Sequence, residues 1–175
     1  MIYSDDHGAT WQVGEAIQPG HNECQVAELA DGRLLMNVRM QRYSEGFRGI
    51  AYSETSGETR TDFSHDHNLV CPKCQAGLLG YPDGLKLIFS NPFPHDPMAE
   101  AEEETKFYPG TGRGPRVNMT IRLCEDGGDT WIRSESLFGG PSGYSCLVIV
   151  QDGSLGCLYE CGESKISEQI VFERF

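Results

Sequence analysis

Ser4-Asp5-Asp6-His7-Gly8-Ala9-Thr10-Trp11 follows the pattern S-x-D-x-G-x-T-W, and Cys124-Glu125-Asp126-Gly127-Gly128-Asp129-Thr130-Trp131 repeats it with Cys in the place of Ser. An Asp side chain in such a turn accepts hydrogen bonds from nearby backbone N–H groups. The Gly adopts a backbone angle that other residues resist, and the Trp is expected to bury a large apolar area beneath the turn. A pattern this specific rarely recurs by chance, so it indicates repeated hairpin units.

Apolar runs separated by turn residues predict a series of strands around these motifs. Asp-Gly pairs at 31–32, 83–84 and 152–153 are good hairpin signals between such runs. A degenerate copy of the motif, at 53–59, keeps Ser, Gly and Thr but lacks Asp and Trp. The expected strands are Gln25–Leu29, Leu34–Met40, Arg48–Ser53, Gln75–Tyr81, Leu85–Asn91, Val117–Cys124, Trp131–Phe138, Tyr144–Val150, Leu155–Glu160 and Gln169–Phe175.

The order of strands and motifs predicts an all-β fold built from propeller blades. Units of four strands with a period of roughly 40–50 residues are typical of such blades. The whole chain, 1–175, is expected to form one partial propeller domain, with two complete blades and partial blades at each end. Because such an arrangement cannot close a ring, we expect the chain to be the C-terminal half of a larger protein, or to need another chain. An insertion at 93–115 carries the acidic run 100–104, which predicts a solvated loop.

Composition narrows the classes of function. The formal net charge of -12 argues against nucleic acid or an anionic membrane as a partner, since both require basic patches. No apolar run reaches the roughly 18 residues of a membrane-spanning helix, and the first residues do not resemble a signal peptide. The seven cysteines are an odd number, so at least one is expected to remain unpaired within the chain.

Five polar side chains stand out in or beside apolar runs: Glu23, Arg39, Arg116, Tyr144 and Glu160. Such groups are costly in a sheet unless they are paired or face solvent. Their placement at corresponding positions of successive blades favours convergence on the propeller axis. We therefore expect them to form one site.

The chain resembles the exo-α-sialidase family, and within it the lysosomal-type animal sialidase. The repeated turn is the Asp box that is typical of sialidase-like β-propellers, which have six blades in this family. The other segments that carry the resemblance are Asn22-Glu23-Cys24-Gln25, Asn37-Val38-Arg39, Cys74-Gln75, Phe89-Ser90-Asn91-Pro92, Arg116-Val117-Asn118-Met119-Thr120, Gly140-Pro141-Ser142-Gly143-Tyr144-Ser145 and Leu158-Tyr159-Glu160.

The resemblance implies a role for each of the five side chains. Tyr144 matches the nucleophile and Glu23 the glutamate that activates it. Arg39 and Arg116 match the second and third arginines of the triad that binds the substrate carboxylate, and Glu160 matches the acid that orients the first. The implied substrates are terminal α-linked sialic acids of glycoproteins, oligosaccharides and gangliosides. No cofactor or metal is implied, and the family location is lysosomal or membrane-associated.

Two parts of the family's site have no counterpart in this sequence. The first triad arginine, in a Phe/Tyr-Arg-Ile-Pro motif, is absent, and so by position is the general-acid Asp. Loss of a general acid typically costs a factor of about 10²–10⁴ in rate. Two other readings therefore stay open: a non-catalytic Asp-box propeller that binds glycan or protein, and an inactive truncated fragment.

A zinc site is a weaker alternative. His65-Asp66-His67, followed by Cys71 and Cys74, gives the pattern H-x-H-x3-C-x2-C, which could supply four ligands to zinc. Zinc motifs usually pair two separated ligand clusters, so a loop preceding a strand is the favoured interpretation. A dithiol or a disulfide at Cys71 and Cys74 is a further minor option.

Overall fold

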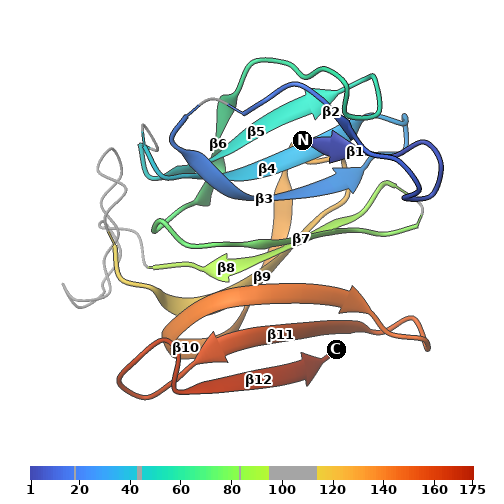
Figure 1. The fold of residues 1–175 in the computed structure, drawn as a ribbon. Coiled ribbons are helices and arrows are strands. Elements are labelled where there is room, and N and C mark those ends of the chain that lie inside the picture. The colour runs from blue at the N-terminus through green and yellow to red at the C-terminus, as the bar shows by residue number, and fades with distance from the viewer. Residues whose placement is uncertain (18, 43–44, 83, 95–113) are drawn as a thin grey trace.

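The computed structural model describes residues 1–17, 19–42, 45–82, 84–94 and 114–175, and every regular element within these ranges is a β-strand (Figure 1). The predicted all-β class is therefore confirmed. The acidic run 100–104 and most of the insertion at 93–115 lie outside the described residues. The strands are β1 (Ile2–Tyr3), β2 (Gln12–Val13), β3 (His21–Glu28), β4 (Leu34–Met40), β5 (Phe47–Ser53), β6 (Ser64–Val70), β7 (Gly77–Gly80), β8 (Leu87–Pro92), β9 (Val117–Cys124), β10 (Trp131–Ile149), β11 (Leu155–Cys161) and β12 (Gln169–Arg174).

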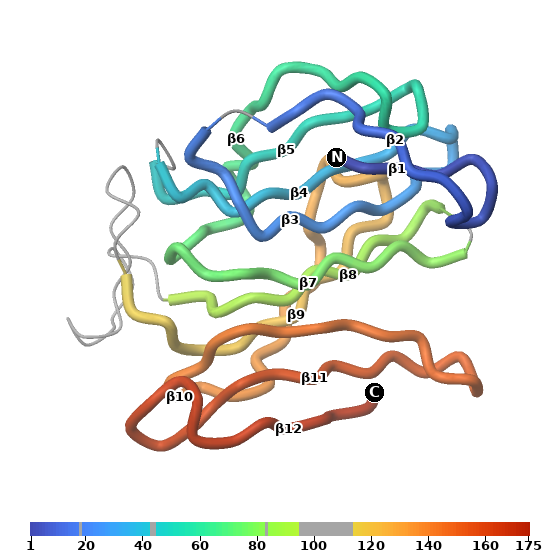
Figure 2. Tube along the Cα trace, viewed as in Figure 1, coloured from blue at the N-terminus to red at the C-terminus, as the bar shows by residue number. Residues whose placement is uncertain are grey.

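The strands are grouped as antiparallel blades in chain order. β3, β4, β5 and β6 form one four-stranded sheet, and β1 pairs with β2 in a short hairpin. The remaining six strands form a sheet in the order β12-β11-β10-β9-β8-β7. β3, β7 and the second half of β10 follow one another along one side of the molecule (Figure 2). These three strands are the first strands of successive blades, and they bring distant parts of the sequence together.

β10 corrects one sequence-based prediction. Residues 131–138 and 144–150 were expected to be separate strands joined by a flexible Gly-rich link, but one strand runs through both. Its first part pairs with β9 and its second part with β11, so it belongs to two blades in turn. The link is ordered because its backbone is hydrogen bonded: Ser142 N–H donates to the Arg116 carbonyl at 2.9 Å, and Gly162 N–H to the Pro141 carbonyl at 3.1 Å.

β6 is a strand that the sequence pattern did not predict. It includes His65, Asp66 and His67, which were interpreted as part of a loop. As the last strand of its blade, β6 presents several polar residues to solvent and buries Asp66 and Leu69. Its polar sequence lacks the apolar alternation on which strand prediction depends.

The two complete turn motifs adopt the hydrogen-bonding pattern expected of them. In the first, the Asp6 carboxylate accepts from the Thr10 N–H and from the Thr10 hydroxyl, both at 2.7 Å. These bonds, with one from Ser4, lower the pKa of Asp6 to about 2. Gly8, with φ of 90°, has the positive backbone angle that the turn requires.

The substituted motifs show which atoms the turn needs. Cys124 Sγ donates to Asp126 Oδ1 at 2.9 Å and accepts from the Gly128 N–H at 3.0 Å, as the Ser hydroxyl does in the first motif. In the degenerate copy, the Thr55 hydroxyl replaces the carboxylate and accepts from the Thr59 N–H at 2.8 Å. The turn therefore survives these changes because a hydrogen-bonding side chain remains at each position.

The motif tryptophans differ in their surroundings. Trp131 packs on Phe89, with ring centroids 5.6 Å apart, and donates its indole N–H to Asp66 Oδ2 at 3.2 Å. Trp11 is 63% exposed, so the expectation that it is buried is wrong. Asp66 lies on β6, the last strand of the blade that precedes Trp131. The Trp is therefore buried by its neighbouring blade as much as by its own turn.

The larger cluster of buried apolar residues lies between the β3–β6 sheet and the blade formed by β7, β8, β9 and the first part of β10. A smaller cluster lies under β10 and β11. The larger cluster contains Ala27, Leu29, Leu35, Leu69, Ala76, Leu78, Leu87, Phe89 and Cys124. It joins residues of β3, β4, β6, β7, β8 and β9, so the two blades share one interior.

Phe89→Ala should lower the free energy of unfolding by about 3–5 kcal/mol, because the ring is fully buried and its loss leaves a cavity between the blades. Phe172→Ala provides the matched control, since this ring is 52% exposed, and it should cost less than about 1 kcal/mol. Urea unfolding of both variants would measure the difference. Equal losses would contradict the shared core.

Candidate active site

Glu23 lies at a β-bulge on β3. Asn22 is opposite Arg39 and Cys24 is opposite Val38, so Glu23 is an extra residue with no partner on β4. Its φ is 43°, a left-handed conformation that is uncommon for a residue with a side chain. A bulge re-aims the side chain that it carries, and here it brings the Glu23 carboxylate to the Tyr144 phenol.

Tyr144 lies at a second irregularity, on β10. Ser142 pairs with Cys161 and Ser145 with Tyr159, so β10 carries one more residue than β11 across this step. The Tyr144 N–H donates to Glu160 Oε2 at 3.0 Å. A Cβ atom on Gly143 would lie 2.3 Å from the same oxygen, so the carboxylate fits only beside a glycine.

The two bulged residues meet, although they are 121 positions apart in the chain. The Tyr144 hydroxyl donates to Glu23 Oε1 in a short hydrogen bond, and Arg39 Nη1 donates to Glu23 Oε2. The same Arg39 nitrogen lies 3.5 Å from the Tyr144 hydroxyl oxygen, and Arg39 Nη2 donates to Gln41 Oε1 at 2.6 Å. One carboxylate thus links a phenol and a guanidinium.

Arg116 and Glu160 lie at the margins of this contact. Arg116 Nη2 donates to the Lys73 carbonyl at 2.6 Å, and its charge is close enough to lower the pKa of Glu23. Glu160 contacts the backbone of Tyr144, and no ion pair joins it to an arginine within the described part of the chain. The structure therefore brings the five predicted residues into one region, at the end of the sheets where β3 and β9 begin (Figure 1).

The pKa shifts indicate that the proton of the Tyr144–Glu23 hydrogen bond stays on Tyr144. The hydrogen bond to Glu23 is the main cause that raises the pKa of Tyr144, so the phenol keeps its proton. Burial acts to raise the pKa of Glu23, but the hydrogen bonds from Tyr144 and Arg39 outweigh it and lower that pKa. Burial likewise opposes the raised pKa of Arg39, which the bond to Glu23 produces. At neutral pH the site thus holds a neutral phenol, a carboxylate and a guanidinium.

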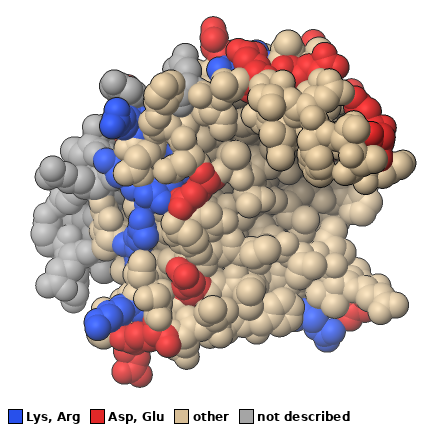
Figure 3. Space-filling model, in the orientation of Figure 1, with Lys and Arg blue, Asp and Glu red and all other residues tan. Residues whose placement is uncertain are grey.

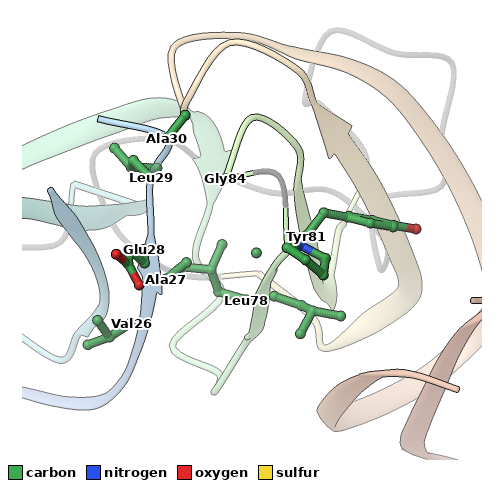
Figure 4. Close-up of a pocket in the computed structure, with 11 residues that line it drawn as sticks. Val26, Ala27, Glu28, Leu29, Ala30, Leu78, Tyr81 and Gly84 are labelled. Atoms are coloured by element: carbon green, nitrogen blue, oxygen red, sulfur yellow. The ribbon is translucent and has the colours of Figure 1, made fainter. Parts of the chain in front are cut away.

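The surface charge around the site differs from the charge of the whole chain. Figure 3 shows Lys and Arg side chains gathered on the left of the molecule with acidic side chains among them. In this way, a chain with a net charge of -12 still presents local positive charge. A separate pocket between β3 and β7 is lined by residues 26–30, 78–82 and 84, which include none of the five (Figure 4).

The zinc alternative finds no support in the geometry. Within the described ranges, no group of three or more His, Cys, Asp or Glu side chains is placed to hold a metal ion. His65 and His67 lie on β6, with ring centroids 6.1 Å apart. Cys71 and Cys74 are buried free thiols beside Arg48, whose Nη1 donates to the Cys74 carbonyl at 2.9 Å. The minor option of a disulfide between the two cysteines is therefore wrong.

Sequence reasoning gave no role to two glutamines that the structure places at the site. Gln41 accepts a hydrogen bond from Arg39, and Gln75 is hydrogen bonded to the backbone of Ser145. Gln75 contributed to the family resemblance, but no pattern in the sequence indicated what its amide contacts. Its partner is 70 residues away, and only the fold reveals the pairing.

Comparisons with known proteins identify the family of this chain. The family model for the BNR repeat-like domain matches residues 1–157. A sialidase of Micromonospora viridifaciens is 34% identical over 92% of this chain and 23% of its own length, and Sialidase-3 of Mus musculus is 31% identical over 98% and 48%. Among solved structures, the Hadza microbial sialidase Hz136 superposes with a TM-score of 0.74 at 32% identity, covering 99% of this chain and 31% of that one.

The chain therefore belongs to the sialidase family with BNR, or Asp-box, repeats, and its fold is that of sialidase β-propellers. It spans about half or less of the length of these relatives. The expected likeness to the lysosomal-type animal enzyme stays a prediction.

No helix that is long and apolar enough to cross a membrane occurs in the residues that the structure describes. The lysosomal or membrane-associated location stays an expectation from the resemblance.

Tyr144→Phe should raise the pKa of Glu23, because it removes the first of the hydrogen bonds that lower this pKa. The ¹³C NMR signal of the labelled Glu23 carboxyl, followed against pH, would measure the change. Tyr159→Phe is the matched control, since the Tyr159 hydroxyl donates to Glu173 at 3.0 Å. This variant should leave the Glu23 titration unchanged, and an unchanged Glu23 titration in Tyr144→Phe would contradict the contact.

Proposed function

We propose that this chain carries the nucleophile and part of the carboxylate-binding site of an exo-α-sialidase. The reaction is the release of terminal α-linked sialic acid from glycoproteins, oligosaccharides and gangliosides, with retention. The observation that supports it best is the Tyr144 phenol hydrogen bonded to the Glu23 carboxylate beside Arg39. The relatives named sialidases support the same reaction class.

A phenol suits this substrate because sialic acid carries a carboxylate on its anomeric carbon. A carboxylate nucleophile would be repelled by that charge, whereas a tyrosine is neutral until it loses its proton, and sialidases are the Tyr exception among glycosidases. In the proposed step, the Tyr144 oxygen bonds to the anomeric carbon while Glu23 accepts the phenol proton. The glycosidic bond breaks, and the leaving oxygen takes a proton from an acid. Water then attacks the anomeric carbon and loses a proton to the now deprotonated acid, while Glu23 returns its proton to the departing Tyr144 oxygen.

Arg39 and Arg116 are proposed to bind the substrate carboxylate. A guanidinium can donate to both oxygens of a carboxylate at once. Arg39 Nε is buried and has no hydrogen-bond partner among the described residues. The guanidinium of Arg116, held through Nη2 on the Lys73 carbonyl, keeps further N–H donors for the substrate.

The remaining parts of the site are proposed to come from further blades of the full protein, or from another chain. These parts are the first triad arginine, which Glu160 would orient, and the general-acid Asp. Apolar side chains are exposed at both ends of the described fold, and additional blades would cover them. On β1, β2 and their turn they are Ile2, Trp11 and Val13, and on β10, β11 and β12 they are Val148, Leu158, Ile170 and Phe172.

Two alternatives, a non-catalytic propeller that binds glycan or protein and an inactive fragment, make different predictions. A binding propeller has no need of a Tyr–Glu pair beside an arginine, and the geometry therefore favours catalysis. An inactive fragment is favoured by the exposed apolar ends. Assay of the chain alone, and of the chain joined to the N-terminal blades of a relative, separates these readings. Turnover in the joined form supports the proposal, and binding without turnover supports a binding propeller.

Tyr144→Phe should abolish turnover in the joined form while sialic acid binding persists, because only the nucleophilic oxygen is lost. Hydrolysis of a fluorogenic aryl α-sialoside and NMR binding of free sialic acid measure the two effects. Tyr3→Phe is the matched control, since Tyr3 is hydrogen bonded to Gln12 on the first hairpin. Unchanged turnover in Tyr144→Phe would overturn the assignment of the nucleophile.

Arg39→Ala and Arg116→Ala should each weaken binding of sialic acid by about 1.5–3 kcal/mol, the value of a lost charged hydrogen bond. This is a factor of roughly 10 to 150 in Kd. Arg174→Ala is the matched control, because Arg174 is exposed and pairs with Asp152 at 2.9 Å. Isothermal titration gives the affinities, and wild-type affinity in both site variants would contradict the assigned role.

A further inference from the structure

We propose that Gln75 is a positioning residue for Tyr144, acting through the backbone of Ser145. The inference rests on the proposed function for its catalytic consequence, although the placement of Tyr144 can be tested without any activity. The side-chain amide of Gln75 occupies the position that a neighbouring strand would otherwise fill.

The Gln75 amide contacts both backbone groups of Ser145. Gln75 Nε2 donates to the Ser145 carbonyl at 2.9 Å, and Gln75 Oε1 accepts from the Ser145 N–H at 2.9 Å. Within a strand, the N–H and C=O of one residue point to the same side, so a single amide can meet both. Gln75 Nε2 also donates to the Ala76 carbonyl at 2.9 Å, which fixes the amide itself.

Glu160 holds the neighbouring peptide from the other strand. Glu160 Oε2, on β11, accepts from the Tyr144 N–H at 3.0 Å. The Ser145 hydroxyl, in turn, lies 2.8 Å from the Ser90 hydroxyl and donates to the Ser90 carbonyl at 3.1 Å. The side chains of Gln75 and Glu160 thus bind the backbone on either side of the Tyr144 Cα, where the bulge has interrupted the regular ladder, and Ser90 holds the Ser145 hydroxyl.

The need for a glutamine follows from this geometry. The contact requires one donor and one acceptor on the same planar group, which the amide provides and a carboxylate or an aliphatic chain does not. Without the amide, the buried Ser145 backbone groups lose their partners, and the strand gains freedom at the residue that must aim the phenol. A displacement of about 1 Å at a reacting group can cost on the order of 10²-fold in rate.

Gln75→Met tests the proposal, since Met has similar length and makes no such hydrogen bonds. In protein labelled with ¹³C at tyrosine Cζ, the pKa of the Tyr144 phenol should fall toward the ordinary tyrosine value as the phenol moves from Glu23. The signal is assigned by its absence in Tyr144→Phe. The Tyr52 signal, whose raised pKa comes mainly from burial, is an internal control and should not move. Gln12→Met, on the first hairpin, is the matched control and should leave Tyr144 unchanged.

Gln75→Asn is the second variant, because it keeps the amide but shortens the side chain by one methylene. It decides the test if Gln75→Met does not fold, and it should produce the same direction of change. In the joined form, kcat should fall by an order of magnitude or more with little change in KM. An unchanged Tyr144 titration in either folded variant would overturn the inference. The two proposals can also fail separately. If the Gln75 variants shift the Tyr144 titration but the wild-type joined form hydrolyses no sialoside, the proposed function is overturned and the positioning role stays intact.

Discussion

The site depends on the contact between Tyr144 and Glu23. This contact forms only if two separate blades are held in a fixed position relative to one another. Each residue lies at a β-bulge, and each bulge lies on the first strand of its blade. β7 lies between these two strands, so the core that joins the blades also fixes the distance between phenol and carboxylate. The left-handed backbone of Glu23 has a cost in conformational energy, which the bonds to Tyr144 and Arg39 offset.

The turn motifs act at the other end of the same sheets. Their hydrogen bonds close each hairpin locally, and Cys or Thr can replace Ser or Asp without loss of the pattern. The Trp of the motif makes contacts beyond its own turn. Trp131 donates a hydrogen bond to Asp66 on the preceding blade and packs on Phe89 of its own blade. The motif therefore closes the turn and joins neighbouring blades, whereas the proposed catalytic residues lie at the opposite edge of the sheets (Figure 1).

The sequence predicted some strands well and missed others for physical reasons. The boundaries of Leu34–Met40 and Val117–Cys124 agree with the structure, because these strands are apolar and bounded by clear turns. β6 was missed because its stability comes from pairing with β5 and from burial of Leu69 and Asp66, which its polar sequence does not reveal. The residues of the site were recognised by resemblance, but the bulges that aim them and the amide of Gln75 depend on contacts far apart in the chain.

Bulges explain why the site uses so many bonds from side chains to the backbone. An extra residue breaks the regular ladder and leaves peptide groups without strand partners. At Tyr144 those groups are bound by Glu160 and, one residue later, by Gln75. Gly143 is required because the Glu160 carboxylate occupies the space that a Cβ would fill. The distortion of β10 at Tyr144 thus creates the need for the polar side chains that hold its backbone in place.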